Sequence, residues 1–193
     1  YVMSGQAVSL FSTSYPNYQL TTGIADDLVE ASIDNGDGTW TYSVPITQGY
    51  EWSDGKAITA NDMVFTYNTA KDLGLLSNWE TSYPQGSGTD SAAEGYAQGI
   101  LSLVASDDYT VQITLNFDAG LASWQYQVAQ APILPESYWA QFATDRETLL
   151  AASGADAPVA SAFVYNKIEQ GAFYTWAYDA NTMWNGGTTT IYK

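Results

Sequence analysis

The sequence has no cysteine and no histidine among its 193 residues, and only five side chains are basic. Without cysteine the chain can form neither disulfide bonds nor zinc–thiolate sites. Without histidine it lacks the most common general base and metal ligand of proteins. These absences exclude most nucleophilic triads and metal centres, so we expect neither a catalytic site, nor a bound metal, nor a cofactor.

Basic residues are scarce against 21 acidic ones, which gives a formal net charge of −16. Such a field repels the phosphates of nucleic acids and the headgroups of anionic lipids, so neither is an expected partner. The acidic residues are dispersed along the chain, which is typical of a solvated surface. The missing cysteine and the many Tyr, Thr, Ser, Gln and Asn residues favour an extracellular protein.

Long apolar runs are also absent: no stretch approaches the roughly 20 apolar residues that a membrane-spanning helix needs. The first residues lack the basic start of a signal peptide, so we expect any export signal to have been removed or to lie outside this sequence.

Apolar residues nevertheless make up 46% of the chain and aromatic residues 15%, which is enough to fill a core. Alternation of apolar and polar residues predicts strands, and apolar spacing by three and four predicts helices. The first 23 residues are expected to be mostly loop. The fold class is therefore α+β, an antiparallel sheet with several short helices. Single strands are expected at 39–44, 174–178 and 188–192, and a hairpin of two strands is expected over 103–115. Helices are expected at 59–73, 91–101, 119–130, 133–139 and 145–152.

The most informative stretch lies between residues 52 and 67. Trp-Ser-Asp-Gly at 52–55 predicts a turn, and Thr-Ala-Asn-Asp at 59–62 has the spacing of a capping box at the start of a helix. These residues are accordingly expected to have structural roles. The residues concerned are Trp52, Asp54, Gly55, Thr59 and Asp62.

Three patterns suggest chemistry. Ser53 and Lys56 have the spacing of a Ser-x-x-Lys catalytic pair, but the Asp-Gly between them favours a turn over the required helix. The segment 33–44 resembles a calcium loop but lacks carboxylates at its first and twelfth positions, so a hairpin turn is favoured. A pair of carboxylates could hydrolyse a glycosidic bond without histidine, and such a hydrolase remains an alternative, although no pair is singled out.

The polar loop 77–90 contains two aromatic residues, Trp79 and Tyr83, where no periodic pattern demands burial. Flat amphipathic rings in such a loop suit stacking on a ligand, and the alternative is that they fold back onto their own helix.

Several motifs together resemble the family-5 extracellular solute-binding proteins, the oligopeptide, dipeptide and nickel receptors of ABC importers. Gly-Thr-Trp-Thr-Tyr-Ser-Val at 38–44, Trp-Ser-Asp-Gly at 52–55 and Thr-Ala-Asn-Asp-Met-Val-Phe-Thr-Tyr at 59–67 occur in the family's order. Ser-Asp-Asp-Tyr-Thr-Val at 106–111 and Ile-Leu-Pro-Glu-Ser-Tyr-Trp at 133–139 continue the match. The resemblance covers about residues 24–193. The chain departs from the family in lacking its Gly-Pro-Tyr near 162–165 and the arginine before the Trp-Ser-Asp-Gly turn.

The resemblance implies part of a class II periplasmic-binding-protein-like lobe. Residues 1–23 would be an N-terminal loop segment, 24–160 the smaller subdomain of the first lobe, and 161–193 return strands into its main part. The chain would then belong to a monomeric, non-catalytic protein that captures a peptide or similar small solute and delivers it to the membrane subunits of an ABC importer. Such a protein would be extracellular, at the cell surface or periplasmic, and membrane-anchored at full length.

Solute contacts are expected from Trp79 and Tyr83, from Tyr15 and Asn17 in the N-terminal loop, and from a second lobe that this sequence lacks. As an isolated piece, the chain is expected to bind solute weakly or not at all. The alternative from a different class is a surface or assembly protein that reuses this subdomain for contacts, since the composition is acidic and rich in Tyr, Thr and Gln.

Overall fold

The computed structural model describes residues 8–14, 16–29, 31–75, 99–118 and 131–160, together with the backbone of strands at 163–169 and 173–178. Within this part of the chain, no helix has the length and apolar character needed to cross a membrane. The elements are β1 (Phe11–Thr13), β2 (Leu20–Thr22), β3 (Ile33–Asp34), β4 (Trp40–Pro45), α1 (Ala60–Asp72), β5 (Ile100–Asp107), β6 (Thr110–Leu115), α3 (Glu136–Trp139), α4 (Arg146–Ala151), β7 (Phe163–Glu169) and β8 (Phe173–Tyr178).

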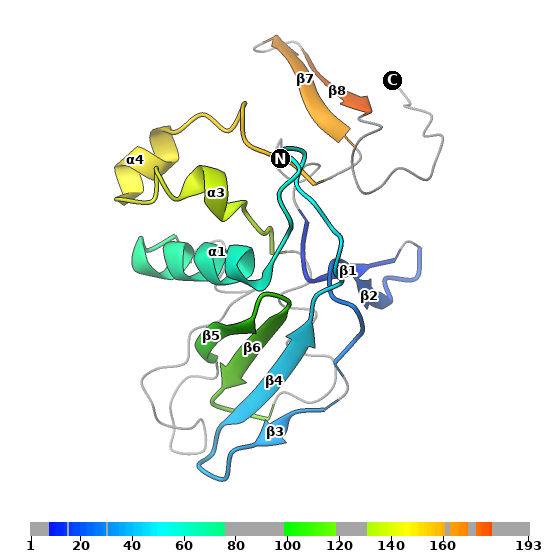
Figure 1. Ribbon diagram of the computed structural model, residues 1–193, viewed down its shortest axis with the longest axis vertical. Coiled ribbons are helices and arrows are strands. Elements are labelled where there is room, and N and C mark those ends of the chain that lie inside the picture. Colours follow the sequence, from blue (N-terminus) through cyan, green and yellow to red (C-terminus); the bar gives the residue numbers. More distant parts are fainter. Residues whose placement is uncertain are drawn as a thin grey trace.

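A four-stranded antiparallel sheet with the order β3-β4-β6-β5 forms the base of the molecule (Figure 1). Tyr42 of β4 is paired with Ile113 of β6, and Val44 with Val111, and all four side chains are buried. Polar residues between them point to the other face, as the alternation of a strand requires. The predicted strand at 39–44 and the hairpin over 103–115 are thus confirmed.

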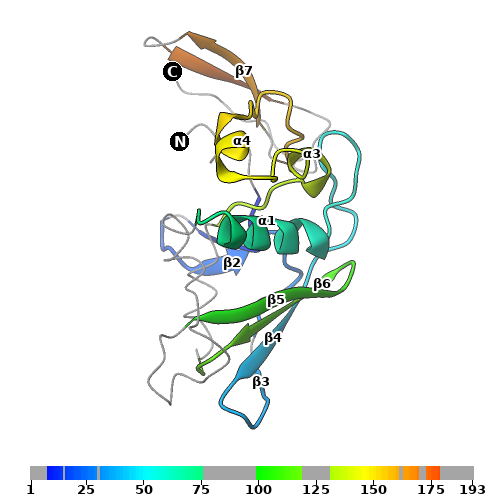
Figure 2. The same ribbon diagram turned by 90° about the vertical axis from the view of Figure 1, so that its left-hand side faces the viewer.

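Helix α1 lies between this sheet and the segment that carries α3 and α4 (Figures 1 and 2). Met63, Tyr67 and Ala70 are spaced by four and three residues and are buried, which places one face of the helix in the core. Thr59 and Asp62 form the predicted capping box at its start. Gly74 follows its end with a φ of 64°, a left-handed conformation that favours glycine.

The N-terminal segment is part of the core, which the sequence analysis did not predict. It forms an antiparallel hairpin of β1 and β2, and Leu10 and Phe11 are fully buried. A side chain at Gly23 would place its Cβ 2.1 Å from the carbonyl oxygen of Ser9, so only glycine fits this close approach. The described residues of this segment therefore include a short hairpin whose apolar side chains are part of the core, and the residues outside its two strands are loop.

The last described strands, β7 and β8, form a hairpin of their own. Strand β8 was predicted, but β7 was not, and the strand expected at 188–192 lies outside the described residues. The helix expected over 91–101 is wrong at its end, because residue 99 is in a bend and β5 begins at residue 100. Residues 91–98, and those of the helix expected at 119–130, lie outside the described part. The helices expected at 133–139 and 145–152 are confirmed as α3 and α4.

Candidate functional site

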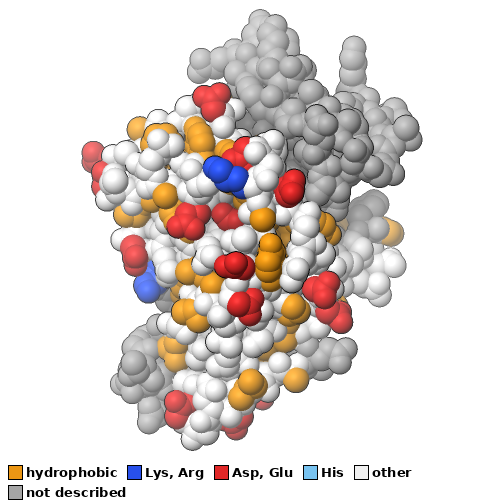
Figure 3. Space-filling view, viewed as in Figure 1, with side chains coloured by type: hydrophobic (Ala, Val, Ile, Leu, Met, Phe, Trp, Pro, Cys, Tyr) orange, Lys and Arg blue, Asp and Glu red, His pale blue; other side chains and the backbone are white. Residues whose placement is uncertain are grey.

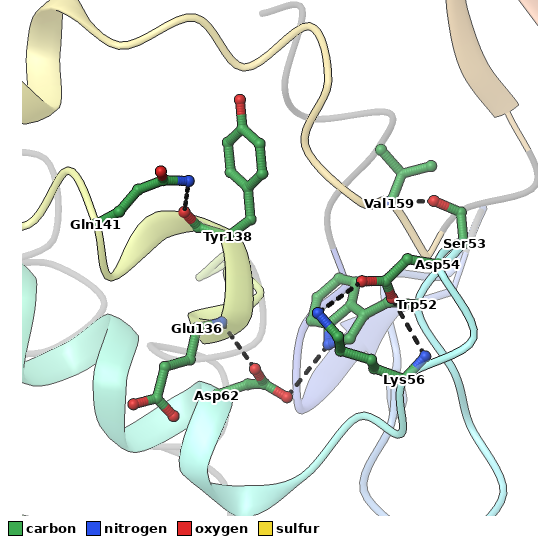
Figure 4. A network of polar contacts seen from close by, with 9 residues as sticks. All are labelled: Trp52, Ser53, Asp54, Lys56, Asp62, Glu136, Tyr138, Gln141 and Val159. Atoms are coloured by element: carbon green, nitrogen blue, oxygen red, sulfur yellow. Dashed lines mark hydrogen bonds and ion pairs between the residues drawn. The ribbon is translucent and has the colours of Figure 1, made fainter.

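The side chain of Asp62 joins three segments of the chain (Figure 4). Its Oδ2 accepts the indole N–H of Trp52 at 3.2 Å and the amide of Thr59 at 3.0 Å. Its Oδ1 accepts the amide of Glu136 at 2.9 Å. The carboxylate therefore holds together the start of α1, the turn that begins at Trp52 and the start of α3.

Burial raises the pKa of the Asp62 carboxyl above its usual range, because desolvation disfavours the charged form. The hydrogen bonds from Thr59, Glu136 and Trp52 act in the opposite direction, and the nearby charge of Asp54 adds to the increase. A carboxylate that accepts three hydrogen bonds and has no cation beside it among the described residues is suited to fixing a fold rather than to proton transfer with a substrate.

Thr66, one turn further along α1, continues this contact. Its hydroxyl donates to the carbonyl of Asp62 at 2.6 Å and accepts the amide of Leu134 at 2.9 Å. The amide of Ile133 donates to the carbonyl of Val8 at 2.8 Å. The extended segment before α3 is thus bound on one side by the N-terminal segment and on the other by polar side chains of α1.

The turn at 52–55 binds a different part of the chain. The amide of Ser53 donates to the carbonyl of Val159 at 2.8 Å, and the hydroxyl of Ser53 accepts the amide of Val159 at 3.0 Å. Gly55 closes the turn with a φ of 81°. This pair of bonds therefore fixes the position of the segment around residue 159 against the turn.

The geometry does not support the Ser-x-x-Lys reading. Lys56 forms an ion pair with Asp54 at 3.1 Å, and the Ser53 hydroxyl is engaged by the Val159 amide on a turn rather than on a helix. Asp34 and Asp37 accept hydrogen bonds from backbone amides of their own hairpin turn, as expected for that segment. In the described ranges, no three Asp or Glu side chains gather in a way that could hold a metal ion.

The residues expected to contact solute are only partly described. Asn17 is exposed in the turn between β1 and β2, while Tyr15, Trp79 and Tyr83 lie outside the described residues. Next to Asn17, Tyr18 has a φ of 52° and is 67% exposed. Tyr18 is not among the residues predicted to contact solute, although Pro16 and Asn17 before it are typical of a turn.

A groove of about 320 Å³ lies between α1 and the segment that carries α3. No motif predicts it, because it forms between one helix and a segment about 70 residues further along. Its lining residues are Asn61, Val64, Phe65, Asn68, Thr69, Asp72, Leu73, Glu136 and Ala143.

Comparison with known proteins gives one family and many similar structures. The family model described as bacterial extracellular solute-binding proteins, family 5 Middle, matches residues 23–191. The comparison with curated protein sequences gives no match.

Three solved structures illustrate the similarity of fold. The periplasmic oligopeptide-binding protein of an oligopeptide ABC transporter from Thermotoga maritima is 19% identical, with a TM-score of 0.59 over 91% of this chain and 27% of its own. NikZ from Campylobacter jejuni, in complex with Ni(L-His), is 16% identical and has a TM-score of 0.66; the match covers 94% of this chain and 31% of NikZ. The oligopeptide-binding protein AppA from Bacillus subtilis, in complex with a nonapeptide, is 20% identical and has a TM-score of 0.58; the match covers 93% of this chain and 31% of AppA. The chain therefore spans about a third of the length of these proteins.

Proposed function

This chain belongs to the bacterial extracellular solute-binding proteins of family 5, and from that premise we propose that its protein captures a solute outside the cell and delivers it to an ABC importer. The observation that carries the proposal is the family match over residues 23–191. The fold similarity covers more than nine tenths of the chain and agrees with it. The family is one of binding proteins, not of enzymes.

A peptide is the solute class that we favour. Two of the similar structures are oligopeptide-binding proteins, and one of them holds a nonapeptide. The solute would be enclosed between two lobes that close over it, and the closed form would be recognised by the membrane subunits of the importer. The full-length protein would act as a monomer, anchored to the membrane or free in the periplasm.

The Asp62 junction would contribute rigidity to this mechanism. It fixes three segments with buried hydrogen bonds and leaves no described reactive group aimed at a substrate. Rigid lobes are what a closing motion requires, because the binding free energy is then not spent on ordering the lobe itself. Solute contacts would come from Asn17, which is exposed, and from the three residues that the sequence analysis singles out besides it, Tyr15, Trp79 and Tyr83.

The test is mass spectrometry of the solute that co-purifies with the full-length protein, followed by calorimetry with that solute. We expect a peptide, binding with micromolar or tighter affinity to the full-length protein and far more weakly to the 193-residue chain. A full-length protein without a second lobe and without bound solute would instead support the surface or assembly role. Micromolar peptide binding by the chain alone would contradict the two-lobe mechanism.

A further inference from the structure

The groove along α1 contains side chains of three kinds. Asn61 and Asn68 supply amides and Thr69 a hydroxyl, all able to accept hydrogen bonds. Val64, Phe65 and Leu73 are half-buried and supply an apolar surface. Among the described lining residues only Asp72 and Glu136 are ionisable, so this part of the lining is negative. Its volume is at the lower end of the range of small-molecule sites.

The backbones of the two acidic residues lie near opposite ends of α1. Glu136 is next to the start of α1, because its amide donates to Asp62, whereas Asp72 is the last residue of the helix. Ten residues of helix separate those levels, a rise of about 15 Å along the axis. Figure 4 shows the Glu136 side chain directed away from the Asp62 carboxylate and towards α1. A ligand that contacts both residues is therefore expected to extend along the helix.

Asp72 occupies a position that is unfavourable for its charge. The carboxyl end of a helix carries partial negative charge and is stabilised by cations. The same end already attracts one cation, because Arg146 Nη1 donates to the carbonyl of Gly74 at 2.7 Å. Among the described residues the only ion pair is that of Lys56 with Asp54, so neither groove carboxylate has a cationic partner there.

The surrounding surface reinforces this preference. The face that carries α1 and α3 shows acidic side chains in several places and few basic ones (Figure 3). The chain has 21 acidic and 5 basic residues, and such a field concentrates cations near the surface and repels anions. The ligand class that fits a long, negative groove with apolar walls is a chain of methylene groups with ammonium ends.

We propose that the groove along α1 binds a linear polyamine, with one terminal ammonium at Glu136, the other at Asp72, and its methylene groups against Val64, Phe65 and Leu73. Asn61, Asn68 and Thr69 accept hydrogen bonds from the inner amines. This site is independent of the solute that the protein captures.

The test is calorimetric titration of spermine into the 193-residue chain and into two double variants with the same change of net charge. The first carries Asp72→Asn and Glu136→Gln in the groove. The second carries Asp156→Asn and Glu51→Gln, exposed carboxylates outside it. We expect the groove variant to bind at least about tenfold more weakly, because it loses two charge-assisted contacts, and the control variant to bind within about twofold of the parent chain. Equal losses of affinity in both variants would show that spermine is attracted by net charge only, which would overturn the proposal. Unchanged affinity of the groove variant would overturn it as well.

Two further measurements keep the result interpretable. Circular dichroism should show unchanged folding of the groove variant, since Asp72→Asn removes an unfavourable charge from the helix end. Spermine should shift the side-chain amide resonances of Asn61 and Asn68, and 1,4-diaminobutane, which is too short to reach both carboxylates, should bind more weakly than spermine. Unshifted amides, or equal binding of the two amines, would contradict the proposed pose.

Discussion

The indole N–H of Trp52 donates to the carboxylate of Asp62 at 3.2 Å, and both side chains are buried. The two residues belong to the two motifs by which the family is most easily seen, the Trp-Ser-Asp-Gly turn and the Thr-Ala-Asn-Asp helix start. A buried hydrogen bond thus joins the two motifs directly. Their residue types are explained by hydrogen bonding inside the fold, and no contact with a solute is needed to account for them.

Replacing Asp62 by Asn should destabilise the fold. The carboxylate accepts three hydrogen bonds, and an amide presents a donor to at least one of the donors that face it. The cost of leaving a buried donor unsatisfied is about 1–3 kcal/mol. Urea denaturation followed by tryptophan fluorescence measures it. The exposed Asp26→Asn is the matched control, with an expected change within about 0.5 kcal/mol; an equal effect of both substitutions would contradict the role of Asp62.

The pH dependence of stability should reveal the same carboxyl. Its pKa is raised in the folded state, so the folded state binds the proton more tightly than the unfolded state. The resulting stability is fully present below the ordinary pKa of 3.8 and is lost as the pH rises through the raised value. The stability difference between the parent chain and Asp62→Asn should therefore be largest at acid pH and shrink towards neutrality. A difference that grows with pH would show that the three hydrogen bonds outweigh burial.

Replacing Thr66 by Val should loosen the segment before α3. The substitution keeps the shape of the side chain but removes the hydroxyl that accepts the Leu134 amide and donates to the Asp62 carbonyl. We expect a loss of about 1–3 kcal/mol in urea denaturation, because a buried donor loses its partner. Thr66→Ser keeps the hydroxyl and should recover most of the loss; if it does not, packing of the methyl group is the cause.

Replacing Ser53 by Ala should free the amide of Val159. The backbone bond from the Ser53 amide remains, but the bond to its hydroxyl is removed. Hydrogen exchange at Val159 should become faster, and the free energy of unfolding should fall by about 0.5–1.5 kcal/mol. Ser43→Ala, on the exposed side of β4, is the control and should leave exchange at Val159 unchanged. Unaltered exchange in Ser53→Ala would show that the turn does not hold the segment before β7.

Most of the sheet and the start of α1 could be predicted because their causes are local. The alternation around Tyr42, the turn at 52–55 and the capping box of Thr59 and Asp62 depend on neighbours within a few residues. The N-terminal hairpin could not be predicted in this way. Its strands are three residues each, and their burial depends on contacts such as that of Val8 with Ile133, far along the chain.

The sequence by itself determined the class of the fold, the family and the absence of histidine and cysteine chemistry, since composition and ordered local motifs suffice for these. The tertiary structure decided what the motif residues do. Asp62 meets Glu136 across 74 positions and Ser53 meets Val159 across 106. The groove between α1 and Glu136 likewise depends on contact between segments that are far apart in the sequence. The physical reason is that a hydrogen bond or a cavity depends on distances in space, and local preferences do not fix the distance between residues so far apart in the chain.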